Sequence, residues 1–311
     1  MLKKVVKSSV LLALAVSSLN AAAFNEQAEK DRKALVQYFE TKFQDAEANK
    51  DRFFPYSTNE ELKGFIKNVK HKDFGLGSYA YNKSAKDQYV ELEFQDGFVQ
   101  EELLAQGEKI YNKKFANGKS IASCFPDPTV VNTYPKFDTA KKEVVSLTNA
   151  VNNCVRENGE KELHTKKGDM AKVQAYMAYQ SAKAGKVVDI TIPTKEAQDA
   201  YERGKKEYYS QRGYINVSCA SCHVQGTGQR VRNEYMSPLL GSTTHFPVFR
   251  MKWDAEGPGD GLGTLERRMS GCVVDQGQKP AKDESKWMKE LLYFMAYMSN
   301  GMKIDGPDLR K

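Results

Sequence analysis

The residues with the clearest chemical meaning form the pentapeptide Cys219-Ala-Ser-Cys222-His223. Two thiols at this spacing can add to the two vinyl groups of one haem, and the adjacent imidazole can then bind the iron from the same face. A thioredoxin-like redox pair and half of a zinc site are the competing interpretations. However, no βαβ pattern surrounds the motif, and no second Cys-x-x-Cys or His-x-x-x-His completes a zinc shell. The pentapeptide therefore predicts one covalently bound haem c.

Two helical patterns flank this motif and are expected to position it. Residues 194–209 have a helix-forming composition with apolar or aromatic side chains along one face, and residues 285–298 repeat large apolar side chains every three or four positions. A helix, a haem motif, a long loop and a second helix follow one another in this order in cytochrome c. In that fold the terminal helices cross, and Gly204 would permit their close approach.

The same landmarks occur a second time, earlier in the chain. The parallel segments are residues 106–111 and 203–208, residues 134–137 and 246–249, and residues 176–179 and 294–297. In addition, Cys154 lies 23 residues before Met177, and Cys272 lies 23 residues before Met295. Several landmarks in one order, two of them with identical offsets, indicate an internal duplication.

The duplication predicts a mainly α-helical chain made of two tandem cytochrome c-like domains, the first without haem. We expect a haem-less domain with an N-terminal elaboration over residues 24–190, and a haem-binding domain over residues 191–311. Counted from a preceding glycine, Cys124 stands where the second domain has Cys219, and Pro128 takes the place of the imidazole.

The chain has 5 cysteines, an odd number that cannot all pair within one molecule. If Cys272 faces the haem, then Cys154 faces an empty site near Cys124, and we predict a disulfide between these two rather than two free buried thiols. Cys272 is then left single. Cys272 and Met269 are the two candidates for the second axial ligand of the haem iron, and the matching position of Cys154 favours Cys272.

The first residues predict export to the periplasm. Lys3, Lys4 and Lys7 precede an apolar stretch at residues 10–16, and small residues up to Ala23 form a cleavage site, so residues 1–23 read as a signal peptide. In that compartment c-type haem is attached and disulfides are stable. No later stretch is apolar enough to span a membrane. The 47 Lys and Arg against 40 Asp and Glu form no dense basic tract, which suits a small anion or an acidic partner better than nucleic acid.

The chain resembles the SoxA family, the cytochrome subunits of thiosulfate-oxidising SoxAX complexes. The resemblance covers essentially the whole mature chain and rests on the duplicated architecture, the Cys-x-x-Cys-His motif and the segment Arg268-Met-Ser-Gly-Cys272. It implies an L-cysteine S-thiosulfotransferase that joins thiosulfate to a cysteine of a SoxYZ-like carrier and passes electrons through haem to a SoxX-like small c-type cytochrome. It also implies that Cys272 is the axial ligand, found as a persulfide, and that Arg268 binds substrate. Because the first domain lacks a haem motif, the chain looks like the single-haem type.

These implied roles agree with the chemistry of the side chains. Joining thiosulfate to a thiol releases a proton and two electrons, so the site needs an anion clamp, a sulfur relay and an electron exit. Arg268 offers a planar cation for a sulfonate-like head, although Arg267 is an alternative and a salt bridge or haem-propionate contact is an alternative role. Cys272 offers the sulfur relay. A plain electron-transfer cytochrome with Met269 as ligand and a haem-thiolate sensor are the alternative functions.

Overall fold

The computed structural model describes residues 24–81, 100–231, 234–257 and 259–310, so the expected signal peptide lies outside the described residues. The N-terminal segment covers residues 24–81 and begins with a helix over residues 24–42. The further α-helices are α2 (Lys50–Phe53), α3 (Asn59–Lys63), α5 (Gln100–Asn112), α6 (Ile121–Cys124), α7 (Leu147–Glu157), α8 (Asp169–Lys183), α9 (Lys195–Tyr209), α10 (Met251–Glu256), α11 (Leu265–Asp275) and α12 (Lys286–Met298). No helix in this part of the chain is long and apolar enough to cross a membrane.

Short irregular helices and strands connect these elements. The 3-10 segments are η1 (His71–Tyr81) and η2 (Val130–Thr133), and the π-helical turn is η3 (Ser221–Gln225). The strands are β1 (Lys136–Asp138), β2 (Glu143–Val145), β3 (Arg230–Val231), β4 (Glu234–Tyr235), β5 (Val248–Phe249), β6 (Leu262–Gly263) and β7 (Asp308–Leu309). β1 pairs with β2 and β3 with β4, both antiparallel, whereas β5 lies between antiparallel β6 and parallel β7.

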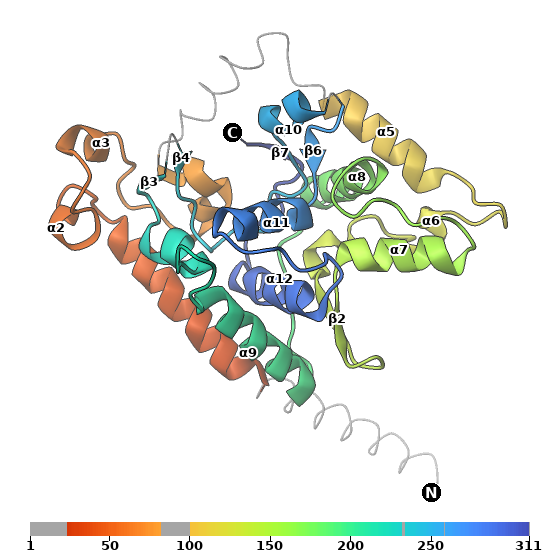
Figure 1. The fold of residues 1–311 in the computed structure, drawn as a ribbon, viewed down its shortest axis with the longest axis horizontal. Coiled ribbons are helices and arrows are strands. Elements are labelled where there is room, and N and C mark those ends of the chain that lie inside the picture. The colour runs from red at the N-terminus through yellow and green to blue at the C-terminus, as the bar shows by residue number, and fades with distance from the viewer. Residues whose placement is uncertain (1–23, 82–99, 232–233, 258, 311) are drawn as a thin grey trace, which may run out of the picture.

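Each half of the chain is built on two helices that cross at a glycine. Helix α5 packs on α8, and α9 packs on α12 (Figure 1). A Cβ atom on Gly107 would lie 2.2 Å from the carbonyl oxygen of Lys172, and one on Gly204 would lie 2.1 Å from that of Glu290. No other residue allows two backbones to approach this closely. The duplicated, mainly helical architecture and the crossing at Gly204 are thus confirmed.

The predicted boundaries of α9 and α12 also agree with the structure, because side-chain caps fix where both helices begin. The hydroxyl of Thr194 accepts a hydrogen bond from the backbone N–H of Ala197, and that of Ser285 accepts one from the N–H of Met288. Such caps satisfy backbone donors that the first helical turn leaves unpaired. The two helices then bury apolar faces against each other.

Helix α11 lies where the sequence predicted only a long loop, and this prediction is wrong. The helix has the same length, 11 residues, as α7 in the first half of the chain. Leu265, Met269 and Val273 recur every four positions and give it an inward face, on which Met269 and Val273 are 5% and 2% exposed. Cys154 and Cys272 each occupy the eighth position of their helix.

The turn before the first-domain cysteine corrects the predicted alignment of the two halves. The backbone N–H of Ser120 donates to Ser123 Oγ at 3.0 Å, just as the N–H of Ser218 donates to Ser221 Oγ at 3.1 Å. Aligned on this turn, Cys124 corresponds to the second cysteine of the motif and not to the first. Phe125, not Pro128, then takes the place of the imidazole. Counting from the preceding glycine failed because the second domain has three extra residues before the turn.

The expected disulfide is present. Cys124, at the end of α6, is bonded to Cys154 in α7, with their Cα atoms 6.2 Å apart. Asn158 directly follows α7, and its side-chain amide contacts Cys124 Sγ at 3.8 Å and Cys154 Sγ at 3.9 Å. The bond therefore occupies the space that corresponds, in the second domain, to the gap between the haem motif and α11.

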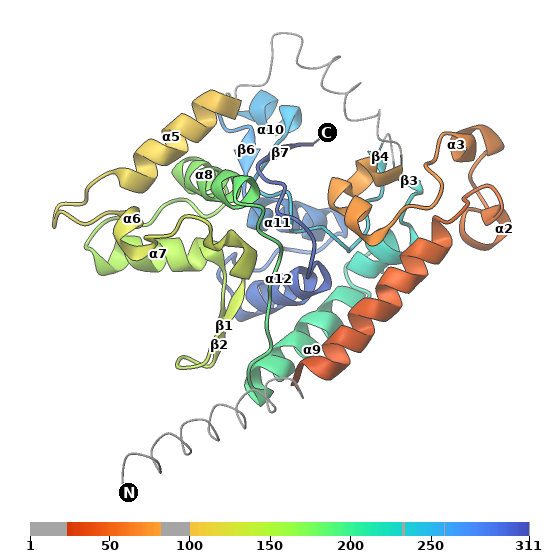
Figure 2. The same cartoon turned by 180° about the vertical axis from the view of Figure 1, so that it is seen from behind.

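The hydrophobic core divides into one large cluster and smaller ones. The large cluster combines residues of the N-terminal segment, such as Phe39 and Phe43, with residues of α9 and α12, such as Tyr201 and Phe294. The cluster around the disulfide is separate and includes Tyr111 and Met177. The N-terminal elaboration thus packs on the second domain, beside α9, as Figure 2 shows from behind.

The helix crossing generates a stability prediction. Gly204→Ala places a methyl group against the backbone of α12, so we expect a loss of about 3 kcal/mol in the free energy of unfolding, at the upper end of the usual cost of overpacking. Gly64→Ala is the control, because its Cβ would meet its nearest atom at an ordinary 3.5 Å. Denaturant titration of both variants measures the difference, and equal stability would contradict the crossing.

The disulfide generates a second prediction. It joins residues 30 positions apart, and a loop of this length contributes roughly 3–4 kcal/mol in the chain-entropy model. The double variant Cys124→Ser and Cys154→Ser should unfold at a correspondingly lower denaturant concentration, with an unchanged haem spectrum because the bond lies in the first domain. A variant as stable as the wild-type chain would show that the bond contributes nothing.

Candidate haem site

The pentapeptide forms a tight turn that leads into η3. Ser218 and Ser221 hold the turn through reciprocal contacts, since the Oγ of each accepts a hydrogen bond from the backbone N–H of the other at 3.1 Å. Cys219 stands inside this turn, while Cys222 and His223 stand on η3. The two thiols and the imidazole are thereby fixed on one short, wound segment.

His223 is held in one tautomer. Its Nδ1 lies 2.8 Å from the carbonyl oxygen of Ser237, and because a carbonyl only accepts, Nδ1 carries the proton. Nε2 then has the lone pair that a metal ligand needs. Burial lowers the pKa of His223, and the nearby Arg268 guanidinium acts in the same direction, so the ring is neutral at neutral pH.

Three cysteines gather at this turn, although Cys272 is some fifty positions further along the chain. Burial, followed by the charge of Cys272, raises the pKa of the free Cys219 thiol to about 11, and the same two causes raise the pKa of Cys222. All three side chains are half-buried. Fully buried Tyr208 lies beside them, since burial and then these cysteines raise its pKa.

Helix α11 distinguishes Cys272 from its rival Met269. Arg268 and Cys272 are four positions apart and therefore share a helix face. Met269 belongs to the same buried cluster as Tyr208, Phe294 and Met295 and is only 5% exposed. A sulfur that exchanges groups with a second protein must be reachable, and of these two side chains the half-buried Cys272 is the more accessible.

Arg267 is committed to other contacts. Its guanidinium stacks 4.3 Å from the ring of Trp253 and donates to the carbonyl oxygen of Leu262 at 3.4 Å. These contacts tie it to β6 and the glycine-rich segment that precedes it. Arg268, in contrast, is close enough to His223 to lower the pKa of the imidazole. Of the two arginines, Arg268 is therefore the one whose charge acts on the imidazole.

Sequence reasoning missed two further residues that contact this site. Ser237 orients the imidazole, and the side-chain amide of Gln276 donates to Cys219 Sγ at 3.9 Å. Gln276 directly follows α11, as Asn158 directly follows α7 and contacts the disulfide. A carboxamide at the same place in both repeats is the signal that would have revealed it.

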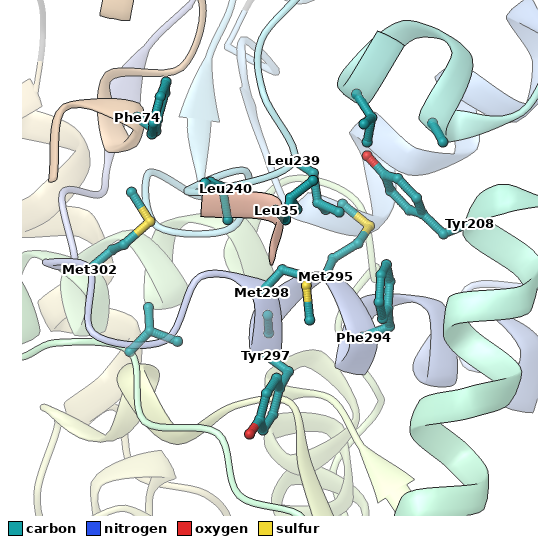
Figure 3. Packing of buried hydrophobic residues seen from close by; sticks show 14 of the residues in the cluster. Leu35, Phe74, Tyr208, Leu239, Leu240, Phe294, Met295, Tyr297, Met298 and Met302 are labelled. Atoms are coloured by element: carbon teal, nitrogen blue, oxygen red, sulfur yellow. The ribbon is translucent and has the colours of Figure 1, made fainter. Parts of the chain in front are cut away.

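The residues present fit a c-type haem. The turn supplies two thiols and a neutral imidazole, and α11 supplies a further sulfur. Apolar side chains of the large core cluster lie next to them, and Figure 3 shows Tyr208, Leu239, Phe294 and Met295 converging. The macrocycle brings its own four nitrogen ligands, so the protein needs to add only axial ones. Accordingly, the described ranges contain no group of three or more His, Cys, Asp or Glu side chains suited to a bare metal ion.

Comparisons with known proteins identify both halves of the chain as cytochrome c-like. The family model for the SoxA/TsdA cytochrome c domain matches residues 106–185 and 203–304. The L-cysteine S-thiosulfotransferase subunit SoxA of Chlorobaculum tepidum is 46% identical over 80% of this chain and 86% of that protein. That of Allochromatium vinosum is 36% identical over 78% and 84%, respectively. The crystal structure of SoxXA from P. pantotrophus superposes with a TM-score of 0.62 at 26% identity, covering 73% of this chain and 84% of that one. The chain therefore belongs to the SoxA family of c-type cytochromes.

Proposed function

We propose that this chain is an L-cysteine S-thiosulfotransferase subunit, which conjugates thiosulfate to a cysteine of a SoxYZ-like carrier protein. The observation that carries the proposal is the shared face of α11, where Arg268 lies one turn from Cys272 and Cys272 lies beside both motif cysteines. An anion clamp and a reactive sulfur thus stand at the edge of a haem site. Relatives that bear this enzyme name support the assignment.

The reaction balances as follows. A carrier thiol and the terminal sulfur of thiosulfate form one sulfur–sulfur bond, and one proton and two electrons leave. Arg268 binds the sulfonate end through its planar fork and leaves the terminal sulfur directed at Cys272. Cys272, as thiolate or persulfide, would form a sulfur–sulfur bond with the terminal sulfur of thiosulfate as two electrons leave. The carrier thiol, after losing its proton, would then attack that sulfur, form the new bond and release Cys272 in its original form. Haem, when bound, accepts the electrons one at a time.

We further propose that the chain would hold one haem covalently through Cys219 and Cys222, and that His223 and Cys272 would be the protein ligands of its iron. The first domain supports a single haem, because its corresponding turn offers one cysteine, which is in a disulfide, and Phe125 in place of the imidazole. Electrons then pass to a SoxX-like small c-type cytochrome, and the likeness to the SoxXA structure supports such a heterodimer.

The placement in the cell and the domain boundaries belong to the same proposal. The mature chain is exported to the periplasm after cleavage near Ala23. It consists of a haem-less domain over residues 24–190 and a haem-binding domain over residues 191–311, and the N-terminal elaboration that precedes the first repeat packs on the second domain. The disulfide supports an oxidising compartment, since cytosolic thiols are kept reduced.

The anion clamp generates a prediction. Arg268→Ala should lower kcat/KM for thiosulfate-dependent conjugation of the carrier by about a hundredfold or more, as expected when a charged donor at a reacting anion is lost. Arg268→Lys should recover only part of this, because an ammonium lacks the fork. Haem content by intact mass should stay the same in both. Normal turnover of the alanine variant would refute the clamp.

The proposed ligation of iron by the Cys272 sulfur generates another prediction. The wild-type chain should show the low-spin EPR signal of a haem with histidine and thiolate ligands. Cys272→Met should abolish this EPR signal. Its absorption spectrum should instead show the charge-transfer band at the red end of the visible range that is typical of histidine and methionine ligation. The variant should also no longer modify the carrier. If the wild-type chain already shows that band, and Cys272→Ala leaves it in place, Met269 is the ligand and the chain is a plain electron-transfer cytochrome.

A further inference from the structure

A buried lysine from the N-terminal segment reaches the haem-binding turn. Lys42 is 0% exposed, and its Nζ donates a hydrogen bond to the carbonyl oxygen of Gln225 at 2.8 Å. Gln225 is the last residue of η3, two positions after His223. The two partners are 183 positions apart in sequence. A residue far from the motif thus holds the end of the segment that carries the imidazole.

The surroundings of this ammonium group are aromatic. Nζ lies 5.1 Å from the ring centroid of Phe54, 5.8 Å from that of Phe43 and 5.9 Å from that of Phe53. Ring faces attract a cation, and one carbonyl supplies a hydrogen bond. Burial lowers the pKa of Lys42 to about 8, so the group is still mostly protonated at neutral pH. None of the ion pairs among the described residues includes it.

The same aromatic group supports the chain that follows η3. A Cβ atom on Gly228 would lie 2.8 Å from the ring of Phe43, so the loop runs directly over that ring. The amide of Gln229 donates to the carbonyl oxygen of Phe53 at 3.2 Å, and the hydroxyl of Tyr81 donates to that of Met236 at 2.9 Å. Met236 precedes Ser237, which orients the imidazole. The N-terminal segment therefore braces the loop at both ends.

Packing alone does not require a charge at this position. A methionine has a similar length, would fill the same aromatic space and would avoid the cost of taking an ammonium group out of water. A fixed positive charge near a redox centre has a distinct effect, because it stabilises whichever state carries more negative charge. Reduced haem carries one electron more than oxidised haem. A cation at Lys42 would therefore favour reduction.

We propose that Lys42 is a positioning residue for the haem, which fixes the end of η3 through Gln225 and raises the midpoint potential of the haem through its buried charge. The inference rests on the proposed haem attachment but not on turnover, since the potential is measured without thiosulfate or carrier. It assigns a task to the N-terminal elaboration, for which the sequence offers no motif. Loss of the charge should make the haem a weaker electron acceptor.

The experiment is a spectroelectrochemical titration of the full mature chain loaded with haem. Lys42→Met should lower the equilibrium constant for one-electron reduction by about tenfold, which corresponds to about 59 mV, and should leave the free energy of unfolding equal or higher. Lys42→Gln, also uncharged, should shift the potential the same way. Lys42→Arg should stay near the wild-type value. The control is Lys33→Met on the same helical segment, where the side chain is 73% exposed and solvent screens the charge.

The outcomes separate as follows. A wild-type potential in either uncharged variant overturns the proposal. If both uncharged variants fail to take up haem while the arginine variant succeeds, a cation is needed to form the turn, which supports the positioning role. If all three Lys42 variants fold by circular dichroism and none takes up haem, then shape rather than charge is required at this position, and the proposal is wrong. Failure of conjugation in the Arg268 variants tests the proposed function separately.

Discussion

Both halves of this molecule are arranged around the same constraint, which is the position of a helix cysteine opposite the turn of the haem motif or its counterpart. In both halves of the chain, the eighth residue of a helix of 11 residues is a cysteine, and it faces the turn that follows the first helix of the crossing pair. In the first half the two sulfurs are close enough to form a disulfide between Cys124 and Cys154. Because Cys124 aligns with Cys222, the same geometry places Cys272 opposite the second cysteine of the haem motif. The position of Cys272 on α11 is thus a property of the fold.

The charges around this sulfur have linked consequences. Arg268 lies one helical turn from Cys272 and also close to His223, whose pKa it lowers together with burial. One guanidinium can therefore attract an anion and keep the imidazole in its neutral, ligating form. Arg267, in contrast, is held by its contacts with Trp253 and Leu262. An Arg267 side chain turned inward would lose these contacts.

The sequence predicted the parts of this arrangement that depend on local signals. Helices α9 and α12 have clear apolar faces and capping hydroxyls at Thr194 and Ser285, and Gly204 marks the crossing. The disulfide followed from matching offsets and an odd cysteine count. Helix α11 was missed because its cysteine and methionine were read as ligands on a loop, although its apolar residues recur every four positions.

Contacts between distant segments were beyond sequence reasoning. The alignment of Cys124 slipped because three extra residues precede the second-domain turn, and only the matching serine contacts correct it. Ser237 carries no recognisable motif, since a backbone carbonyl acts there. For the same reason, a lone lysine at position 42 gives no signal until the fold brings it to Gln225.

The two halves also differ in how they complete the space around the turn. In the first half, Phe125 occupies the place of the imidazole, and the disulfide joins the turn to α7. Both belong to a small hydrophobic cluster that is separate from the large core. In the second half, the turn must hold an imidazole in one orientation, and the loop that follows η3 must stay fixed over residues 225–231 and 234–237. This loop lies on Phe43 and Phe53 of the N-terminal segment, which belong to the same core as α9 and α12. The elaboration at the N-terminus is therefore coupled to the half of the duplication that retains the haem motif.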